Sequence, residues 1–230
     1  MKRFAAQIAT ALLCFSLCLA AEDEFFPKPG WIETPNPAAD VENAMEGGTF
    51  VSYLGPSPKS LNYYLDNNVM SAQVFSLLYE SLLSRDPQTL EFTPWLASRW
   101  SVSEDKKVFT FWIDEKARWS DGRPVSVEDV LWTYDTLSDP RNLTGPVRYQ
   151  LARLERPEIL EDGGIRFRAK SVHWQNLSAI GSLLILPKHA FAGQDFNLLN
   201  FEFPVVSGQY RIKSFQEGQQ LLLEKRGDYW

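Results

Sequence analysis

Residues Pro94–Val130 carry signals for a strand, a tight turn and a capped helix in close succession. Val108–Ile113 is a run of β-branched and aromatic residues, which favour a strand. Asp121–Gly122 is a turn dipeptide, because glycine tolerates the positive φ that tight turns require. A chain with this order of signals is restricted to folds that combine helices with sheets.

A helix is expected to begin directly after this turn. Ser126 stands three residues before Asp129, which is the spacing of a capping box. Asp139–Pro140 ends the pattern, since proline cannot continue a helix. Glu128 and Asp129 are adjacent and do not face one another on a helix, so capping explains them better than an acid pair does. The apolar face of the helix is predicted to consist of Val127, Val130, Leu131, Tyr134 and Leu137.

The rest of the chain predicts short elements without the regularity of a Rossmann sheet. The expected fold class is α/β with a mixed sheet. Residues 21–48 are rich in proline, asparagine and acidic residues, and are expected to form an extended arm. The expected elements are a strand at Thr49–Tyr53, a helix at Val69–Leu83, a hairpin of Pro157–Leu160 with Ile165–Arg168, a buried strand at Leu183–Pro187, a short helix at Lys188–Phe191, and a hairpin of Tyr210–Phe215 with Gln220–Glu224.

The first twenty residues have the pattern of a cleaved secretory signal peptide, so the protein is expected to be exported. Lys2 and Arg3 form a charged start, and Ala11–Leu19 is mostly apolar. That run is too short for a transmembrane anchor, which needs about 20 apolar residues. Cys14 and Cys18 would leave with the signal, so the mature chain would have no disulfide, thiol nucleophile or cysteine–metal site.

The charge balance excludes some classes of partner. The formal net charge is −6, and it becomes −8 when the two positive charges of Lys2 and Arg3 leave with the signal. Nucleic-acid binding requires a basic surface, and docking on anionic lipid does too. Hydrophobic residues make up 44% of the chain, which is enough for a globular core.

Several motifs, taken in order, resemble extracellular solute-binding protein family 5, the periplasmic oligopeptide, dipeptide and nickel receptors of ABC importers. The resemblance begins with Pro94–Val130, which matches the family's Pro-x-Leu-Ala-x-x-Trp, strand, turn and Glu-Asp-Val pattern. No single motif is specific, but their shared order is. The other matching segments are Ser60–Asn62, Val74–Leu83, Leu186–His189, Val206–Tyr210 and Leu223–Trp230. Departures from the family's pattern are Tyr63, Ile113–Asp114 and Gln209, and none of them disturbs the hydrophobic pattern.

The resemblance implies a periplasmic-binding-protein-like fold of two large lobes and a small accessory lobe. Residues 49–62 and 150–230 would belong to the first lobe, and residues 63–149 to the accessory lobe. Family members are much longer, so the second large lobe is expected to be missing from residues 1–230. The family closes its ligand between the two large lobes, and this chain would supply one side of that cleft.

The function that the resemblance implies is the periplasmic solute-binding component of an ABC importer. The expected partners are a peptide or similar small solute and the permease subunits of the importer, with the receptor a monomer. No cofactor, metal or covalent chemistry is implied. The expected ligand-binding segment is Tyr53, Leu54, Gly55 and Pro56, which in the family can pair with an extended peptide. An ordinary turn that ends a strand explains the same residues equally well.

Trp119 is a further candidate for ligand contact, because it lies next to the Asp121–Gly122 turn. Burial in the core is the usual role of such large rings. His173 and His189 have no cysteine or second histidine at metal-binding spacing, and no nucleophile or phosphate-binding motif is present. These absences argue against a secreted hydrolase, so the chain is not expected to be an enzyme.

A rival hypothesis is that the chain is a truncated or split receptor fragment. It would then bind no ligand of its own and would act at most as an interaction module. Apolar residues left exposed where the missing strands belong would be a sign of this state.

Overall fold

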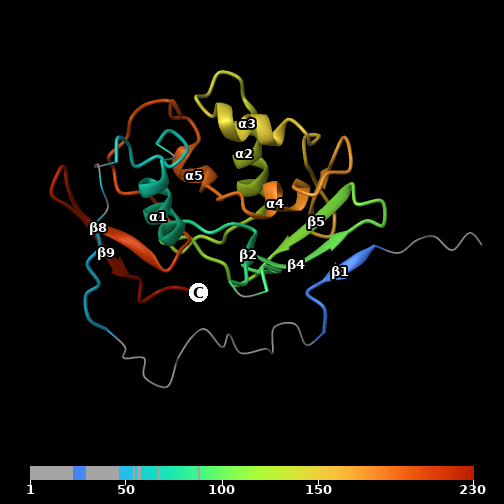
Figure 1. Ribbon diagram of the computed structural model, residues 1–230, viewed down its shortest axis with the longest axis horizontal. Coiled ribbons are helices and arrows are strands. Elements are labelled where there is room, and N and C mark those ends of the chain that lie inside the picture. Colours follow the sequence, from blue (N-terminus) through green and yellow to red (C-terminus); the bar gives the residue numbers. More distant parts are fainter. Residues whose placement is uncertain (1–22, 30–46, 54, 56–57, 67, 88) are drawn as a thin grey trace, which may run out of the picture.

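The computed structural model describes residues 23–29, 47–53, 55, 58–66, 68–87 and 89–230 (Figure 1). The predicted signal peptide and most of the predicted arm lie outside these residues. No helix in the described part of the chain is long and apolar enough to cross a membrane.

Short helices and strands alternate along the described chain. The helices are α1 (Val69–Leu78), α2 (Val127–Ser138), α3 (Gly145–Leu151), α4 (Asn176–Gly181) and α5 (Lys188–Phe191). The strands are β1 (Glu24–Phe26), β2 (Leu83–Arg85), β3 (Phe92–Pro94), β4 (Ala97–Val102), β5 (Val108–Ile113), β6 (Glu158–Ile159), β7 (Ile165–Arg168), β8 (Tyr210–Gln216) and β9 (Gln220–Lys225).

The main sheet has five strands in the order β1-β4-β5-β7-β6, and α2 packs against its β6–β7 side. Phe111 of β5 and Phe167 of β7 are fully buried, with ring centroids 5.9 Å apart. Tyr134 of α2 contacts Phe167 edge-on at 6.2 Å. Alternating apolar residues on the strands therefore meet the apolar face of the helix, as binary patterning requires.

Two smaller sheets complete the fold. The pairs β2–β3 and β8–β9 are separate two-stranded sheets, and Figure 1 shows the β8–β9 hairpin at the opposite end of the molecule from β1. Arg226, just after β9, is buried and donates from Nη1 to the carbonyls of Val206, Ser207 and Gly208 at 3.0–3.3 Å. This guanidinium anchors the hairpin to the preceding loop.

Several predicted elements are confirmed with their bounds. β5 occupies Val108–Ile113, and α5 occupies Lys188–Phe191. α2 begins at Val127, and the Asp129 carboxylate accepts a hydrogen bond from the Ser126 backbone N at 3.0 Å, which completes the capping box. Both predicted hairpins form as β6–β7 and β8–β9. Local signals determined these elements because each has its turn or cap within a few residues.

Other expectations were wrong. Thr49–Tyr53 is not a strand; its residues are exposed and pair with no described residue. α1 ends at Leu78 instead of Leu83, because the chain leaves the helix to form β2. Leu183–Pro187 is mostly buried but forms only one bridge, between Leu184 and Ser81. Leu131 is only partly buried, and Thr133 lies on the buried face of α2 in its place.

The combination of helices and sheets agrees with the predicted class, and every strand pair in the described residues is antiparallel. The predicted boundary between residues 149 and 150 separates β5 from β7, which are neighbours in one sheet. The predicted division into a first lobe and an accessory lobe stays a prediction.

Part of the predicted arm is a strand. β1 pairs with β4, and the Phe26 ring stacks on the Trp100 ring at 5.3 Å with an interplanar angle of 9°. Glu24 forms ion pairs with Lys28 and Lys106. The aromatic stack explains why this short segment stays at the edge of the sheet. Backbone pairing of three residues alone would hold it only weakly, and the contact between the two rings adds the missing stabilisation.

Candidate functional site

Two residues of the predicted ligand-binding segment are described: Tyr53, which is exposed, and Gly55, which is half-buried. Tyr53 is 86% exposed, and Gly55 has a positive φ of 84°. Leu54 and Pro56 lie outside the described residues. Residues 49–53 make no backbone hydrogen bond to any other described residue. The backbone of residues 49–53 is thus exposed, and the strand expected there is not formed.

The chain after this segment is fixed firmly to a distant loop. The Leu61 backbone N donates to the Asn200 carbonyl at 2.6 Å, and the Asn200 N donates to Ser60 Oγ at 3.3 Å. The Asn62 side-chain amide donates to the Phe196 carbonyl at 3.2 Å. Ser60 and Asn62 are both buried. These bonds explain the Ser-Leu-Asn motif, which anchors one end of the exposed segment.

A hollow of about 190 Å³ lies where these two segments meet. Its walls combine apolar side chains with three amides and two carboxylates, those of Asn62, Gln194, Asn200, Asp195 and Glu202. Trp132 of α2 supports it from behind, since its ring lies 6.2 Å from Phe191 and 6.4 Å from Phe196. Whole small-molecule sites are usually about 300–1,000 Å³, so this hollow suits one side chain of a larger ligand.

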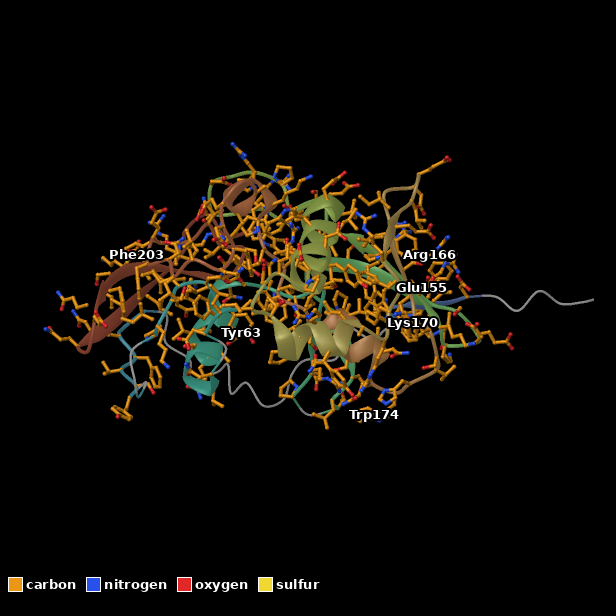
Figure 2. The ribbon with its side chains drawn as sticks, turned by 90° about the horizontal axis from the view of Figure 1, so that it is seen from above. Tyr63, Glu155, Arg166, Lys170, Trp174 and Phe203 are labelled. Carbon is orange, nitrogen blue, oxygen red and sulfur yellow. The ribbon has the colours of Figure 1, made fainter. Side chains whose placement is uncertain are left out.

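Apolar side chains are exposed beside this hollow. The rings of Phe201 and Phe215 stack at 5.8 Å with an interplanar angle of 4°. Figure 2 places Phe203 near the β8–β9 hairpin. Contiguous exposed apolar surface of this kind is unusual for a free monomer and indicates a surface that something else covers. We call this set the apolar ledge, and it consists of Leu198, Leu199, Phe201 and Phe203.

Sequence reasoning missed the hollow and the ledge. Residues 192–205 have no helical or alternating period, so the pattern offered no element there. Trp132 is half-buried against the wall of the hollow. The only available signal was the gathering of phenylalanine and leucine residues in a loop without a period, namely Phe196, Leu198, Leu199, Phe201 and Phe203.

Trp119 is fully buried in the structure. Its indole Nε1 donates to Asp129 Oδ2 at 3.1 Å, and its ring meets the His189 ring edge-on at 6.4 Å. Asp129 Oδ1 also accepts from the Lys188 backbone N at 2.8 Å. Trp119 therefore lies in the core, which is the alternative role considered for it, and a ligand contact would require this cluster to open.

A buried carboxyl group lies beside the last residues of the chain. Glu80 accepts hydrogen bonds from Trp95 Nε1 and from the Tyr229 hydroxyl, the latter at 2.5 Å. No lysine, arginine or histidine of the described chain forms an ion pair with it. Burial raises the pKa of the Glu80 carboxyl, and the two hydrogen bonds oppose that rise. The Glu80 backbone N also donates to Ser207 Oγ at 2.9 Å, so Glu80 joins the end of α1 to the loop before β8 and to the last residues of the chain.

Among the described residues, no group of three or more histidine, cysteine, aspartate or glutamate side chains could hold a metal ion. His189 Nε2 lies 2.7 Å from Asp121 Oδ2, and His173 Nδ1 lies 3.1 Å from Arg153 Nη1. His173 Nδ1 also accepts from the Gln175 backbone N at 3.1 Å, so both histidine rings are held by protein groups.

Comparison with known proteins places this arrangement in a family. The family described as bacterial extracellular solute-binding proteins, family 5 Middle, matches residues 91–230. The Brucella melitensis protein BMEII0691 is 30% identical over 203 residues, which is 85% of this chain and 32% of that protein. The peptidoglycan-binding protein YepA of Agrobacterium fabrum is 32% identical over 67% of this chain and 25% of its own length. The chain therefore spans a third or less of these relatives.

Solved structures share the fold. Haemophilus influenzae OppA, in complex with the peptide RPPGFSPFR, superposes with a TM-score of 0.66 at 23% identity over 77% of this chain and 38% of its own. The periplasmic oligopeptide-binding protein TM1223 of Thermotoga maritima gives 0.59 at 25% identity, over 67% and 29%. The folds agree with a partial periplasmic-binding-protein lobe, and the family consists of binding proteins and not of enzymes. The chain belongs to the family 5 bacterial extracellular solute-binding proteins.

Proposed function

We propose that this protein binds peptides as the periplasmic receptor of an ABC importer. The observation that carries the proposal is the exposed backbone of residues 49–53, which makes no hydrogen bond to another described backbone, together with the hollow at Asn62. An extended peptide can pair with such a backbone and place one side chain in the hollow. Relatives described as peptide-binding or peptidoglycan-binding support this ligand class.

The mechanism is binding without chemistry. Main-chain hydrogen bonds along Tyr53–Pro56 would supply affinity that does not depend on peptide sequence, and the hollow would supply side-chain preference. The apolar ledge would be covered by the rest of the receptor or by the ligand. Delivery to permease subunits, export by the predicted signal peptide and a monomeric state are parts of the same proposal, as is the assignment of residues 49–62 to the first lobe.

The test compares two substitutions at one exposed position. Tyr53→Pro removes the backbone N–H, while Tyr53→Ala removes the ring and retains that donor. Isothermal titration of the exported protein with a mixture of short peptides is expected to show about tenfold weaker binding for Tyr53→Pro, since one hydrogen bond is worth about 1–1.5 kcal/mol. Tyr53→Ala is expected to stay within about threefold of the parent protein. Equal affinity of all three proteins would reject this binding segment.

The alternative, that residues 1–230 alone do not bind, has its own supporting observation. Phe50, Val51 and the apolar ledge are exposed, as expected where a partner segment is missing. The mass of the exported protein decides which form to study. If the protein ends at Trp230 and is a monodisperse monomer that binds peptides, the fragment hypothesis fails. If the protein that ends at Trp230 aggregates and binds no peptide, the fragment hypothesis holds for that protein.

A further inference from the structure

A second cavity of about 490 Å³ lies away from the proposed peptide segment. It is enclosed by the turn at Tyr63–Tyr64, by α3 and by α4 with the residues that precede it. Figure 2 shows Tyr63 and Trp174 on the same side of the molecule, with α3 between them. Its volume falls within the range of about 300–1,000 Å³ that small-molecule sites occupy.

Arg153 is the one charged side chain among the residues that line this cavity. Its Nη1 donates to Gln175 Oε1 at 3.0 Å and lies 3.1 Å from His173 Nδ1. The Gln175 backbone N also donates to His173 Nδ1 at 3.1 Å, so this ring nitrogen is an acceptor for both groups. Both contacts of Arg153 use a single nitrogen, and no described carboxylate forms an ion pair with it. Nη2 and Nε of Arg153 therefore have no partner among the described residues, while the contacts of Nη1 hold the guanidinium in place.

Aromatic and amide groups surround that fork. Trp174 is 81% exposed although it lines the cavity, and its ring stacks on His173 at 5.9 Å with an interplanar angle of 22°. Tyr63 and Gln150 line the same space, and the structure gives neither side chain a hydrogen bond to another described residue. Tryptophan is normally well buried in a folded protein. An exposed indole beside polar side chains that have no protein partner is therefore typical of a ligand-binding site.

We propose that this cavity binds a small carboxylate with a flat or ring-shaped body. The carboxylate would pair with Nη2 and Nε of Arg153, whose planar fork matches its two oxygens. The ring would stack on Trp174, and Tyr63 and Gln150 would complete the polar contacts. A blocked aromatic amino acid and a sugar acid share this chemistry. The proposal does not depend on peptide binding at Tyr53–Pro56, because it uses none of the same residues.

Isothermal titration calorimetry of the exported protein would use two matched pairs of probes. The first pair is N-acetyl-L-phenylalanine and its C-terminal amide; the second is D-glucuronate and D-glucose. The acid that resembles the natural ligand is expected to bind at least about tenfold more tightly than its neutral analogue. The reason is that charge-assisted hydrogen bonds are worth about 1.5–3 kcal/mol. The acid that binds distinguishes a peptide-like from a sugar-like ligand.

Variants locate the binding to this cavity. Arg153→Gln and Trp174→Ala are each expected to weaken acid binding by about tenfold, whereas Arg156→Gln and Tyr149→Ala are not, because the latter two residues do not line the cavity. Because the Trp174 side chain is exposed, Trp174→Ala is expected to leave the fold intact. Weaker acid binding by this variant therefore reports on the site itself. Tyr53→Pro is expected to leave acid binding unchanged, which separates this site from the proposed peptide site. Equal binding of acids and neutral analogues, or no binding of either acid at millimolar concentration, would overturn the proposal.

Discussion

The indole of Trp119 donates its hydrogen to the carboxylate of Asp129, 3.1 Å away, inside the core. The same carboxylate accepts from the backbone N of Ser126 at 3.0 Å and of Lys188 at 2.8 Å. One buried side chain thus joins the turn, the start of α2 and the start of α5. The segment that most resembles the family by sequence is therefore a structural centre of the fold.

Replacement of Asp129 by alanine is expected to destabilise the protein by about 3 kcal/mol. Three donors would lose their acceptor, and at least the Trp119 N–H is fully buried, where an unsatisfied donor costs about 1–3 kcal/mol. Glu128→Ala is the matched control, because Glu128 is the adjacent carboxylate and is exposed. Urea unfolding monitored by tryptophan fluorescence measures both. A cost for Asp129→Ala no larger than that for Glu128→Ala would contradict this role.

Gly208 lies where β8 is about to begin, against the end of α1. A Cβ at this position would lie 2.5 Å from the Leu77 carbonyl oxygen and 2.9 Å from the Leu78 carbonyl. Because these atoms are backbone and cannot move aside cheaply, Gly208→Ala is expected to cost about 1–3 kcal/mol or more. Gly227→Ala meets nothing within 4 Å and serves as the control. Thermal unfolding of the two variants should separate them clearly; similar melting temperatures would show that α1 and this loop are not in contact.

Glu80 predicts a specific pH dependence of stability. Burial raises the pKa of its carboxyl above the ordinary value of 4.5. A group whose pKa is raised by folding contributes stability that is present in full below 4.5 and is lost as the pH rises through its folded pKa. Glu80→Gln cannot ionise, so its stability relative to the parent should improve as the pH rises above 4.5 and should level off once the pH has passed the folded pKa of Glu80.

The measurement is the midpoint of urea unfolding for both proteins across that pH range. Glu80→Leu is the control for the hydrogen bonds, because it removes the acceptor of Trp95 and Tyr229 and should be destabilising at every pH. A stability difference between the parent and Glu80→Gln that stays constant with pH would show that the Glu80 carboxyl is not perturbed.

The sequence predicted the elements whose signals are local. β5 and α2 agree with their expected bounds because a β-rich run, a glycine turn and a capping box each act over a few residues. The hairpin β8–β9 was predicted in the same way, from the turn at Gly218, which has a positive φ of 70°. Such signals need no knowledge of the rest of the protein.

Elements that depend on distant contacts could not be predicted in this way. Thr49–Tyr53 has the composition of a strand, but a strand requires a partner, and no described residue pairs with it. β1 was missed because its place at the sheet edge comes from Phe26 stacking on Trp100, more than seventy residues away in sequence. The wall of the hollow at Asn62 likewise comes from Phe196 and Asn200. Contacts of this range leave no period in the sequence.

Thermal unfolding of the exported protein in the presence of short peptides tests the central claim most directly. A ligand that binds only the folded state must raise the melting temperature with increasing concentration, and it adds about 2.7 kcal/mol of stability at a hundred times its Kd. Peptide binding predicts a rise that grows with the logarithm of peptide concentration and is reduced in Tyr53→Pro. An unchanged melting temperature at millimolar peptide would contradict the proposed function.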